Sequence, residues 1–150
     1  MTTQQQPDAT PAITASMEDY LCSIYRLQQP SGQPVANRSL ARALGVTPAS
    51  TTAMVKRLAQ AELVENAAYR GFRLTQAGEQ AALRLIRRHR LLEAYLSATL
   101  GMRPDDVHAE ADQLEHALSE TVSSLIAAAL GHPSHDPHGT PIPGNDARPR

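Results

Sequence analysis

Residues 39–61, SLARALGVTPASTTAMVKRLAQA, contain two short helical patterns separated by a tight turn. The first pattern has an N-cap at Ser39 and ends at Gly45, a residue type that favours the left-handed conformation at helix C-termini. Pro48 occupies a first-turn position, which favours a second helix over Ala49–Ala61. Two helices joined by so short a turn predict a helix-turn-helix, in which the second helix projects far enough to enter a DNA major groove.

A predicted β-hairpin follows this stretch directly. Leu63–Glu65 and Phe72–Leu74 have the residue pattern of short strands, and Asn66–Gly71 forms the turn between them. A hairpin in this position is the wing of a winged helix, and Arg70 near its tip brings a cation to where phosphates or the minor groove would lie. The alternative is that the helix-turn-helix serves as an ordinary packing or protein-docking unit.

The second helix of the motif presents small side chains outward near its N-terminus. Small side chains allow close approach to base edges and thymine methyl groups. Basic side chains around them are expected to contact phosphates, which positions a protein on DNA without specifying sequence. The predicted DNA-contacting residues are Thr47, Ala49, Ser50, Thr52 and Ala53 on the base side, and Arg38, Arg42, Lys56, Arg57 and Arg70 on the phosphate side.

Further amphipathic helices are predicted on both sides of the winged helix. The first follows an N-cap at Ser16 and stops before Pro30, and a long helix runs from a cap at Thr75 to about Thr99. The last two predicted helices are Asp105 to about His116 and Ser119–Leu130.

Composition fits this helical pattern. Apolar residues make up 41% of the 150 residues, but 24 residues are Ala, Trp is absent and Phe occurs once. A core of Ala and Leu packs on helices, so the predicted fold class is mainly α, and a β-sandwich or barrel is excluded. The single Cys excludes an internal disulfide framework, and no signal peptide or membrane-spanning run is seen. We therefore expect a cytoplasmic protein without a membrane partner.

The formal net charge of −1 is the sum of two opposite halves. Residues 38–90 carry ten basic residues against three acidic ones, a net charge of +7, whereas residues 91–136 carry one Arg against eight acidic residues, a net charge of −7. A basic half suits nucleic acid and an acidic half suits cations. The alternative is that both halves are solvated helix faces.

Candidate metal ligands lie in and beside the acidic half. Two imidazoles and several carboxylates at helical spacing are costly to crowd together unless a cation lies among them. Oxygen and imidazole donors favour Mn²⁺ or Fe²⁺, whereas structural zinc sites favour several cysteines. The predicted donors are His108, Asp112, Glu115 and His116, at positions i, i+4, i+7 and i+8, and His89 and Glu93 on the preceding helix.

Each of these residues also has an ordinary structural interpretation. His89 could be a core histidine, and Glu115 could be a solvated surface acid. Cys22 lies one turn after Asp19, so it either faces the metal site or is a small buried residue, and we favour the second interpretation. The histidines of the C-terminal segment, which we expect to be weak ligands at most, are His132, His135 and His138.

Five short motifs occur in a fixed order along the chain: Ser16-Met17-Glu18-Asp19-Tyr20, Val46-Thr47-Pro48-Ala49-Ser50, Tyr69-Arg70-Gly71, His89-Arg90-Leu91-Leu92-Glu93 and Glu115-His116. Together they resemble the diphtheria toxin repressor and manganese transport regulator family over about residues 16–130. The resemblance implies a homodimeric bacterial repressor with an N-terminal winged helix and a helical dimerisation domain. It also implies that Mn²⁺ or Fe²⁺ enables binding to double-stranded operator DNA.

Carried over by position, the resemblance implies two metal sites. The primary site would use Asp19, Asp112, Glu115 and His116, and an ancillary site would use His89, Glu93 and His108. Asp19 matches manganese-type members and His108 matches iron-type members. Asp112 stands where Cys or Glu is usual, and Cys22 stands where manganese-type members can carry a Glu ligand. This mixture favours Mn²⁺, with Fe²⁺ next, and one or two ions per subunit.

The two halves are expected to act as a switch. The first helix belongs to the DNA-binding part and His116 to the dimerisation part, so a metal bound by both would fix their relative position. Without metal, the acids would repel one another and the parts would become mobile. The apolar face expected to form a symmetric dimer consists of Leu114, Leu118, Val122, Leu125 and Ile126.

The predicted organisation has four parts. Residues 1–14 form a disordered arm, residues 15–75 the winged-helix DNA-binding domain, residues 76–131 the helical metal-binding and dimerisation domain, and residues 132–150 a Pro/His-rich tail or linker. Gly139–Gly144 resembles the Pro-rich stretch that leads to an SH3-like third domain in iron-type members. Whether such a domain follows is left open.

The predicted function is therefore a metal-dependent transcriptional regulator and not an enzyme, with repression of metal-uptake genes as the expected role. Two alternatives remain open at this point. One keeps DNA binding but makes Cys22 a redox sensor or an apolar ligand the effector. The other is a metal-dependent hydrolase built on the same donors, although no catalytic motif is present.

Overall fold

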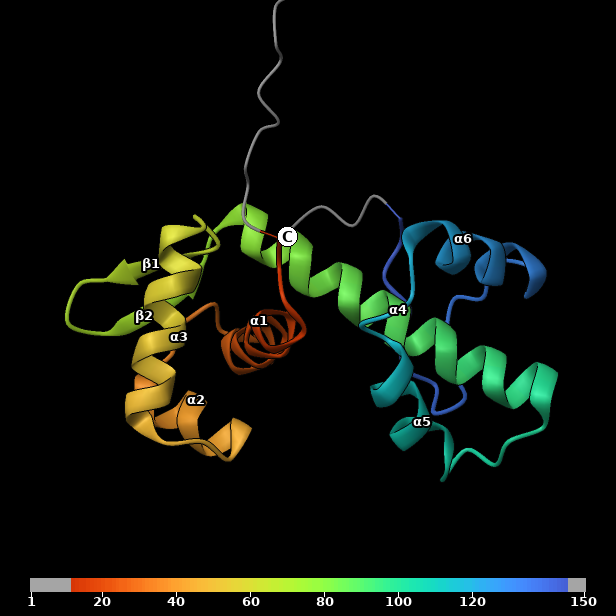
Figure 1. The fold of residues 1–150 in the computed structure, drawn as a ribbon. Coiled ribbons are helices and arrows are strands. Elements are labelled where there is room, and N and C mark those ends of the chain that lie inside the picture. The colour runs from red at the N-terminus through yellow and green to blue at the C-terminus, as the bar shows by residue number, and fades with distance from the viewer. Residues whose placement is uncertain (1–11, 146–150) are drawn as a thin grey trace, which may run out of the picture.

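The computed structural model describes residues 12–145, which form six α-helices and a two-stranded antiparallel sheet (Figure 1). The mainly α fold class expected from the composition is confirmed. The arm predicted over residues 1–14 lies largely outside the described residues. The elements are α1 Ala15–Gln28, α2 Asn37–Leu44, α3 Pro48–Gln60, β1 Val64–Ala67, β2 Gly71–Leu74, α4 Gln76–Leu100, α5 Val107–Leu114 and α6 Glu120–Ala129.

Helix α4 joins the two parts of the molecule (Figure 1). It packs against α1 and β2 on one side of the molecule and against α5 and α6 on the other. Thr75 caps it, as predicted, by accepting a hydrogen bond from the Gly78 backbone, and Gly101 ends it in the left-handed conformation. One continuous helix therefore carries residues of both parts.

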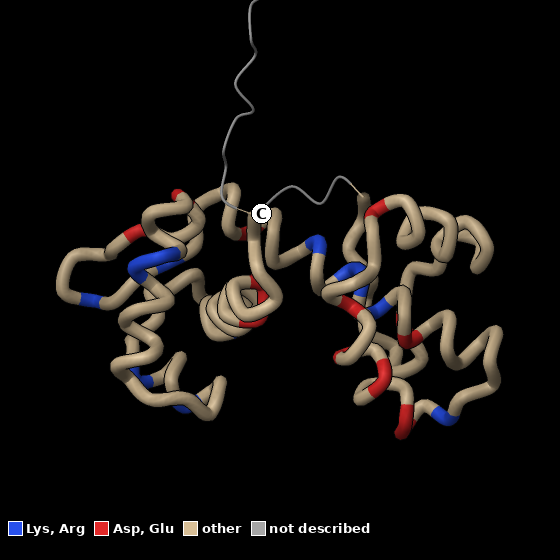
Figure 2. The backbone as a smooth tube through the Cα atoms, in the orientation of Figure 1, with Lys and Arg blue, Asp and Glu red and all other residues tan. Residues whose placement is uncertain are grey.

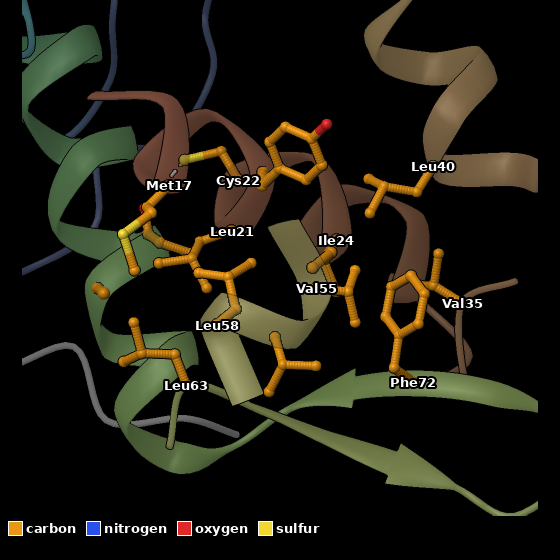
Figure 3. Packing of buried hydrophobic residues seen from close by; sticks show 14 of the residues in the cluster. Met17, Leu21, Cys22, Ile24, Val35, Leu40, Val55, Leu58, Leu63 and Phe72 are labelled. Carbon is orange, nitrogen blue, oxygen red and sulfur yellow. Dashed lines mark hydrogen bonds between the residues drawn. The ribbon is translucent and has the colours of Figure 1, made fainter. Parts of the chain in front are cut away.

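The main hydrophobic core lies where α1 meets the helix-turn-helix, the hairpin and the start of α4 (Figure 3). Leu21 and Ile24 of α1 are fully buried in it, together with Leu40 of α2 and Leu58 of α3. Ala82 of α4 is also fully buried, and its small side chain lets α1 lie close to α4. The position of α1 therefore determines the position of the helix-turn-helix.

The helix-turn-helix forms as predicted from Gly45 and Pro48. Gly45 ends α2 with φ +66°, and Pro48 is the first residue of α3, behind a Thr47 cap that accepts from the Ser50 backbone at 3.1 Å. The Asn37 side chain donates to the Pro48 carbonyl at 3.0 Å, which joins the start of α2 to the start of α3.

Two predicted caps are wrong. The cap of α1 is Thr14 and not Ser16, and α2 begins after Ala36 without a side-chain cap, so Ser39 lies inside its first turn. The reason at α2 is tertiary, because Val35 pairs with Phe72 of the hairpin and the chain turns into the helix directly afterwards.

The wing is a tight hairpin with a third backbone partner. Strands β1 and β2 pair from Val64 opposite Leu74 to Ala67 opposite Gly71, so the turn is shorter than the predicted Asn66–Gly71. Phe72 also exchanges two backbone hydrogen bonds with Val35, of 2.7 and 3.0 Å. This extra pairing anchors the hairpin to the segment that leads into α2.

Helix α5 is shorter than the helix predicted from Asp105 to about His116. Its last helical residue is Leu114, Glu115 caps it, and His116 lies in the turn that leads toward α6. The Ala117 backbone donates to the Leu114 carbonyl at 3.1 Å, which closes this turn. His116 therefore does not lie on the helix stripe that the spacing predicted.

The segment after α6 packs against α4. Arg87 donates to the Pro143 carbonyl at 2.7 Å, Arg90 donates to the Pro141 carbonyl, and Asp136 is buried. The prediction of a tail or linker rested on the missing apolar period. The described part of the segment is instead held to α4 by arginine side chains that donate to its backbone carbonyls. No helix among residues 12–145 has the length and apolar character required to cross a membrane.

Gly71 provides a test of the hairpin anchor. It has φ +109°, and a Cβ atom there would lie 2.1 Å from the Val35 carbonyl oxygen. We expect Gly71→Ala to lower the free energy of unfolding by more than about 2 kcal/mol, measured by urea denaturation, because the backbone must shift away from Val35.

Gly101→Ala is the matched control. Gly101 also has positive φ, +69°, but a Cβ atom added there would have no neighbouring atom within 4 Å. We expect the substitution to cost only about 1 kcal/mol for the left-handed conformation. Equal losses in the two variants would contradict the proposed anchor.

Candidate metal centre and nucleic-acid interface

Imidazole and carboxylate side chains from α1, α4, α5 and the α5–α6 connection line one cavity of about 490 Å³. The cavity lies between the helix-turn-helix part and the C-terminal helices, with Leu44 of α2 on one wall and Asp112 of α5 on another. Donors in and beside this cavity form four overlapping groups, each with its ligand atoms within 4.8 Å of one another.

The first group, here called the Asp19 cluster, consists of Asp19, Glu115 and His116. The His116 Nε2 atom lies 2.9 Å from Asp19 Oδ1 and 3.5 Å from Glu115 Oε1. Asp19 belongs to α1, whereas Glu115 and His116 follow α5. The cluster therefore joins the element under the helix-turn-helix to the C-terminal helices.

The second group, here called the His108 cluster, consists of His89, Glu93 and His108. Glu93 Oε1 lies 3.1 Å from His89 Nε2 and 3.1 Å from His108 Nδ1, and the two imidazoles meet edge to face. His89 and Glu93 are buried one turn apart on α4, and His108 is an exposed residue of α5. These are the three residues that the resemblance assigned to an ancillary site.

His89 connects the two clusters. Its Nδ1 atom lies 2.5 Å from Glu115 Oε2 and 3.4 Å from Asp112 Oδ1, and these three residues form a third possible ligand group. The structure therefore places Asp112 with His89 and Glu115, and 3.5 Å from His108, but in no ligand group with Asp19 or His116. The cause is the end of α5 at Leu114, after which the chain turns away from the stripe that carries Asp112.

Sequence reasoning missed two acidic residues near these clusters, and it did not place His138, predicted to be a weak ligand at most, beside Glu93. Glu18 contacts His116, and Asp136 and His138 form a fourth possible ligand group with Glu93. Asp136 accepts from the His138 and Thr140 backbones at 2.9 and 2.8 Å, which folds the turn toward α4. The Asp136-Pro137-His138 spacing was the available signal, but nothing local showed that it folds back onto Glu93.

Burial and charge compete at the two central histidines. Burial alone would lower the pKa of His89, but its hydrogen bond to Glu115 and the neighbouring carboxylates raise the pKa above its ordinary value. The same holds for His116, where the effect of burial on the pKa is outweighed by the hydrogen bond to Glu18 and the charges of Asp19 and Glu115. Burial and nearby acids raise the pKa of Asp19, although His116 opposes the shift. The carboxylates thus favour the protonated form of both imidazoles.

The donor set fits a divalent cation of the Mn²⁺ or Fe²⁺ type. The four groups contain imidazole nitrogens and carboxylate oxygens and no thiolate. Cys22 is buried, its thiol donates to the Ala82 carbonyl at 3.5 Å, and burial raises its pKa to about 12. Cys22 lines the cavity but belongs to none of the possible ligand groups among the described residues, and its burial fits the buried-residue interpretation.

The predicted DNA face is exposed. Thr47, Ala49, Ser50, Thr52, Ala53, Arg38, Arg42, Lys56, Arg57 and Arg70 are all exposed. The hydroxyls of Thr47 and Thr52 are engaged within α3, with Ser50 and with the Pro48 carbonyl. Tyr69 at the tip of the wing is fully exposed.

The basic half does not act as one surface, however. Figure 2 shows Lys and Arg on the helix-turn-helix and wing but also along α4. Arg87, Arg88 and Arg90 bind Pro143, Glu18 and Pro141, which lie away from the predicted DNA face. The net charge of +7 over residues 38–90 therefore overstates the charge available to DNA.

Comparison with known proteins matches both parts of the chain. Residues 12–72 match the family model described as iron dependent repressor, N-terminal DNA binding domain, and residues 75–144 match iron dependent repressor, metal binding and dimerisation domain. The chain belongs to the iron-dependent repressor family. This confirms the resemblance found from the sequence motifs, and the second match extends beyond the predicted domain boundary at residue 131.

Relatives within this family include both iron and manganese regulators. The iron-dependent repressor IdeR of Mycobacterium tuberculosis is 35% identical over 132 residues, covering 88% of this chain and 57% of IdeR. The HTH-type transcriptional regulator MntR of Listeria monocytogenes is 40% identical over 124 residues, covering 80% of this chain and 86% of MntR. The chain thus spans little more than half the length of the iron-dependent relative.

Solved structures support the same fold. A manganese-dependent transcriptional repressor in complex with manganese aligns with a TM-score of 0.78 and 42% identity, over 89% of this chain and 61% of that one. A structure of ScaR with bound Zn²⁺ aligns with a TM-score of 0.78 and 33% identity, over 87% of this chain and 61% of that one.

The C-terminal helices of this family member leave apolar side chains exposed. Leu125 is 63% exposed, and Leu114 and Val122 are each 44% exposed, while Leu118 and Ile126 are partly buried. Ser123 and Ala127 face α4 instead and are buried, so the exposed residues lie on the other side of α6. The residues predicted as a dimer face are therefore available on the surface of one chain.

The raised pKa values predict how pH affects the metal-free protein. A group whose pKa is raised on folding stabilises the fold fully below its ordinary value, 6.5 for His89 and His116, and loses that contribution as pH rises through the raised value. The unfolding temperature of the metal-free protein is therefore expected to fall between about pH 6 and pH 8. Mn²⁺ should raise that temperature more at about pH 8, where it does not compete with protons.

Differential scanning calorimetry with and without Mn²⁺ tests this expectation. Mg²⁺ at the same concentration controls for ionic strength and is expected to have a smaller effect, because it prefers oxygen ligands to imidazole. A Mn²⁺-induced shift that is larger at the lower pH would contradict the assignment of His89 and His116 to the site.

Proposed function

We propose that this protein is a metal-dependent DNA-binding transcriptional repressor that responds to Mn²⁺ or Fe²⁺. The observation that carries the proposal is the Asp19 cluster, in which α1 and the α5–α6 connection contribute donors to one group. Membership of the iron-dependent repressor family, with both its domain models matched, supports it. Repression of metal-uptake genes is the corresponding role.

The proposed mechanism follows from the double role of α1. Leu21 and Ile24 pack α1 into the core of the helix-turn-helix, while Asp19 on the same helix faces the donors of the C-terminal part. When bound, a divalent cation supplies the positive charge that allows Asp19 and Glu115 to share one site. Asp19, Glu115 and His116, by binding the same cation, would fix α1 relative to the C-terminal helices. Because α1 packs against α2 and α2 against α3, the recognition helix α3 would be fixed as well.

Two sites per subunit are consistent with the donors present. Asp19, Glu115 and His116 would form one, and His89, Glu93 and His108 the other, with Asp112 between them. Asp136 and His138 are further possible ligands to the second site through Glu93. We favour Mn²⁺, with Fe²⁺ next, because all these donors are oxygen or imidazole nitrogen.

DNA binding is proposed to require a homodimer in the cytoplasm. Two recognition helices must match two half-sites of an operator, and the apolar face around Leu125 provides a self-complementary surface of the kind that a two-fold axis uses. In the DNA-bound state, the small residues Ala49, Ser50 and Ala53 would approach base edges, and Lys56 and Arg57 would contact phosphates.

His116→Ala tests the metal-dependent function. We expect wild-type protein to bind a DNA duplex, selected from a random library in the presence of Mn²⁺, only when metal is present and to release it on addition of EDTA. His116→Ala should weaken Mn²⁺-dependent binding at least about tenfold in a mobility-shift assay, because the Asp19 cluster loses its only imidazole.

The matched control is His135→Ala, since His135 is an exposed histidine outside the four ligand groups. It should retain the metal response. Circular dichroism should show that His116→Ala remains folded. Full DNA affinity of the wild-type protein after chelation would refute the proposed function.

Leu125→Glu tests the dimer. A charge placed at the centre of the exposed face of α6 should raise the dimer dissociation constant about 30-fold or more in analytical ultracentrifugation, because the carboxylate must be desolvated there. Ser124→Glu adds the same charge on a flank of α6 and should leave the dimer intact. A dimer equally weakened by both substitutions would place the interface elsewhere.

A further inference from the structure

Glu18 is an acidic residue next to the Asp19 cluster that does not point into it. Its carboxylate oxygens have separate partners. Oε2 accepts a hydrogen bond from His116 Nδ1 at 2.6 Å, and Oε1 binds the Arg88 guanidinium. Only 15% of the Glu18 side chain is exposed, so these two interactions account for both of its oxygens in a largely buried setting.

The partners of Glu18 come from two other elements. Glu18 belongs to α1, Arg88 to α4, and His116 to the connection after α5. Arg88 also donates to the Leu118 carbonyl at 3.3 Å, so it holds the same connection from a second side. The side chain of Arg88 is only 12% exposed, which means that its charge is compensated mainly by Glu18 rather than by water.

The hydrogen bond to Glu18 determines which nitrogen of His116 is available. With Nδ1 donating to Glu18, the other ring nitrogen, Nε2, lies 2.9 Å from Asp19 and 3.5 Å from Glu115. A neutral imidazole that carries its proton on Nδ1 has a lone pair on Nε2, as a metal ligand requires. Carboxylates that hold the second nitrogen of a ligating histidine in this way typically affect metal affinity about 10- to 100-fold.

Arg88 determines the charge of this arrangement. A guanidinium this close to a cation site would repel the cation, and Glu18 cancels that charge. Replacing Glu18 would therefore both release the His116 ring and leave the Arg88 charge uncompensated. In contrast to Asp19, Glu18 belongs to none of the possible ligand groups among the described residues.

We propose that Glu18, held by Arg88, is a positioning residue that orients His116 for metal binding and joins α1 to α4 beside the Asp19 cluster. The proposal rests on the proposed metal site at Asp19, Glu115 and His116. In this proposal Glu18 and Arg88 act on the metal site through His116, without contacting the ion themselves.

A double-mutant cycle tests the proposal. Mn²⁺ binding to the wild-type protein, Glu18→Ala, His116→Ala and the double variant is measured from the electron paramagnetic resonance signal of free Mn²⁺, without DNA. Glu18→Ala should weaken binding about 10- to 100-fold, and in the His116→Ala background it should cause only the smaller loss that the uncompensated Arg88 charge produces. Glu110→Ala, which removes the same charge from an exposed position of α5, should change affinity by less than about twofold.

Glu18→Gln is run in parallel because Gln has the shape of Glu and preserves the packing if Glu18→Ala unfolds. Its amide oxygen can still accept from His116 Nδ1, so Glu18→Gln should lose less affinity than Glu18→Ala when His116 is present, and the two variants should lose the same smaller amount without His116. Additive losses in the cycle, or unchanged affinity in both Glu18 variants, would overturn the positioning role. If His116→Ala itself leaves Mn²⁺ binding unchanged, the proposed metal site fails, and the positioning role fails with it.

Discussion

Five carboxylates and four imidazoles make up the four possible ligand groups of this molecule, and the mutual repulsion of the carboxylates is the constraint on which the rest of the structure depends. Glu93 and Glu115 are buried, so water screens their charges little. The neighbouring carboxylates raise the pKa values of His89 and His116 and so favour the protonated imidazoles. The relative position of the two parts therefore depends on the proton or cation that offsets the negative charge between them.

The alanine-rich composition contributes to this arrangement, because small buried residues allow close packing of the helices that carry the donors. Ala81 and Ala82 let α1 lie close to α4, and this proximity brings Asp19 within hydrogen-bond distance of His116. Larger residues at these positions would widen the gap and separate the donors. Because the other side of α1 packs Ile24 into the core of the helix-turn-helix, a small movement of α1 at the cluster becomes a movement of α3.

The sequence predicted those features that depend on local chemistry. Gly45 and Pro48 specify the turn of the helix-turn-helix, and helical spacing predicts that His89 and Glu93 share a face of α4. Prediction from the sequence failed where distant contacts decide, as at the start of α2, where Val35 pairs with Phe72. The end of α5 separated Asp112 from His116, and the folding of Asp136 back onto Glu93 depends on a C-terminal segment with no apolar period.

The division of charge along the chain shows why linear counting misleads. Residues 38–90 were counted as one basic half, but α4 crosses from the DNA-binding part to the C-terminal part and takes its arginines with it. Arg88 there binds Glu18, and Arg87 and Arg90 hold the segment that carries Asp136. The arginines of α4 therefore bind Glu18 of α1 and backbone carbonyls of the C-terminal segment, and their charges do not add to the predicted DNA face.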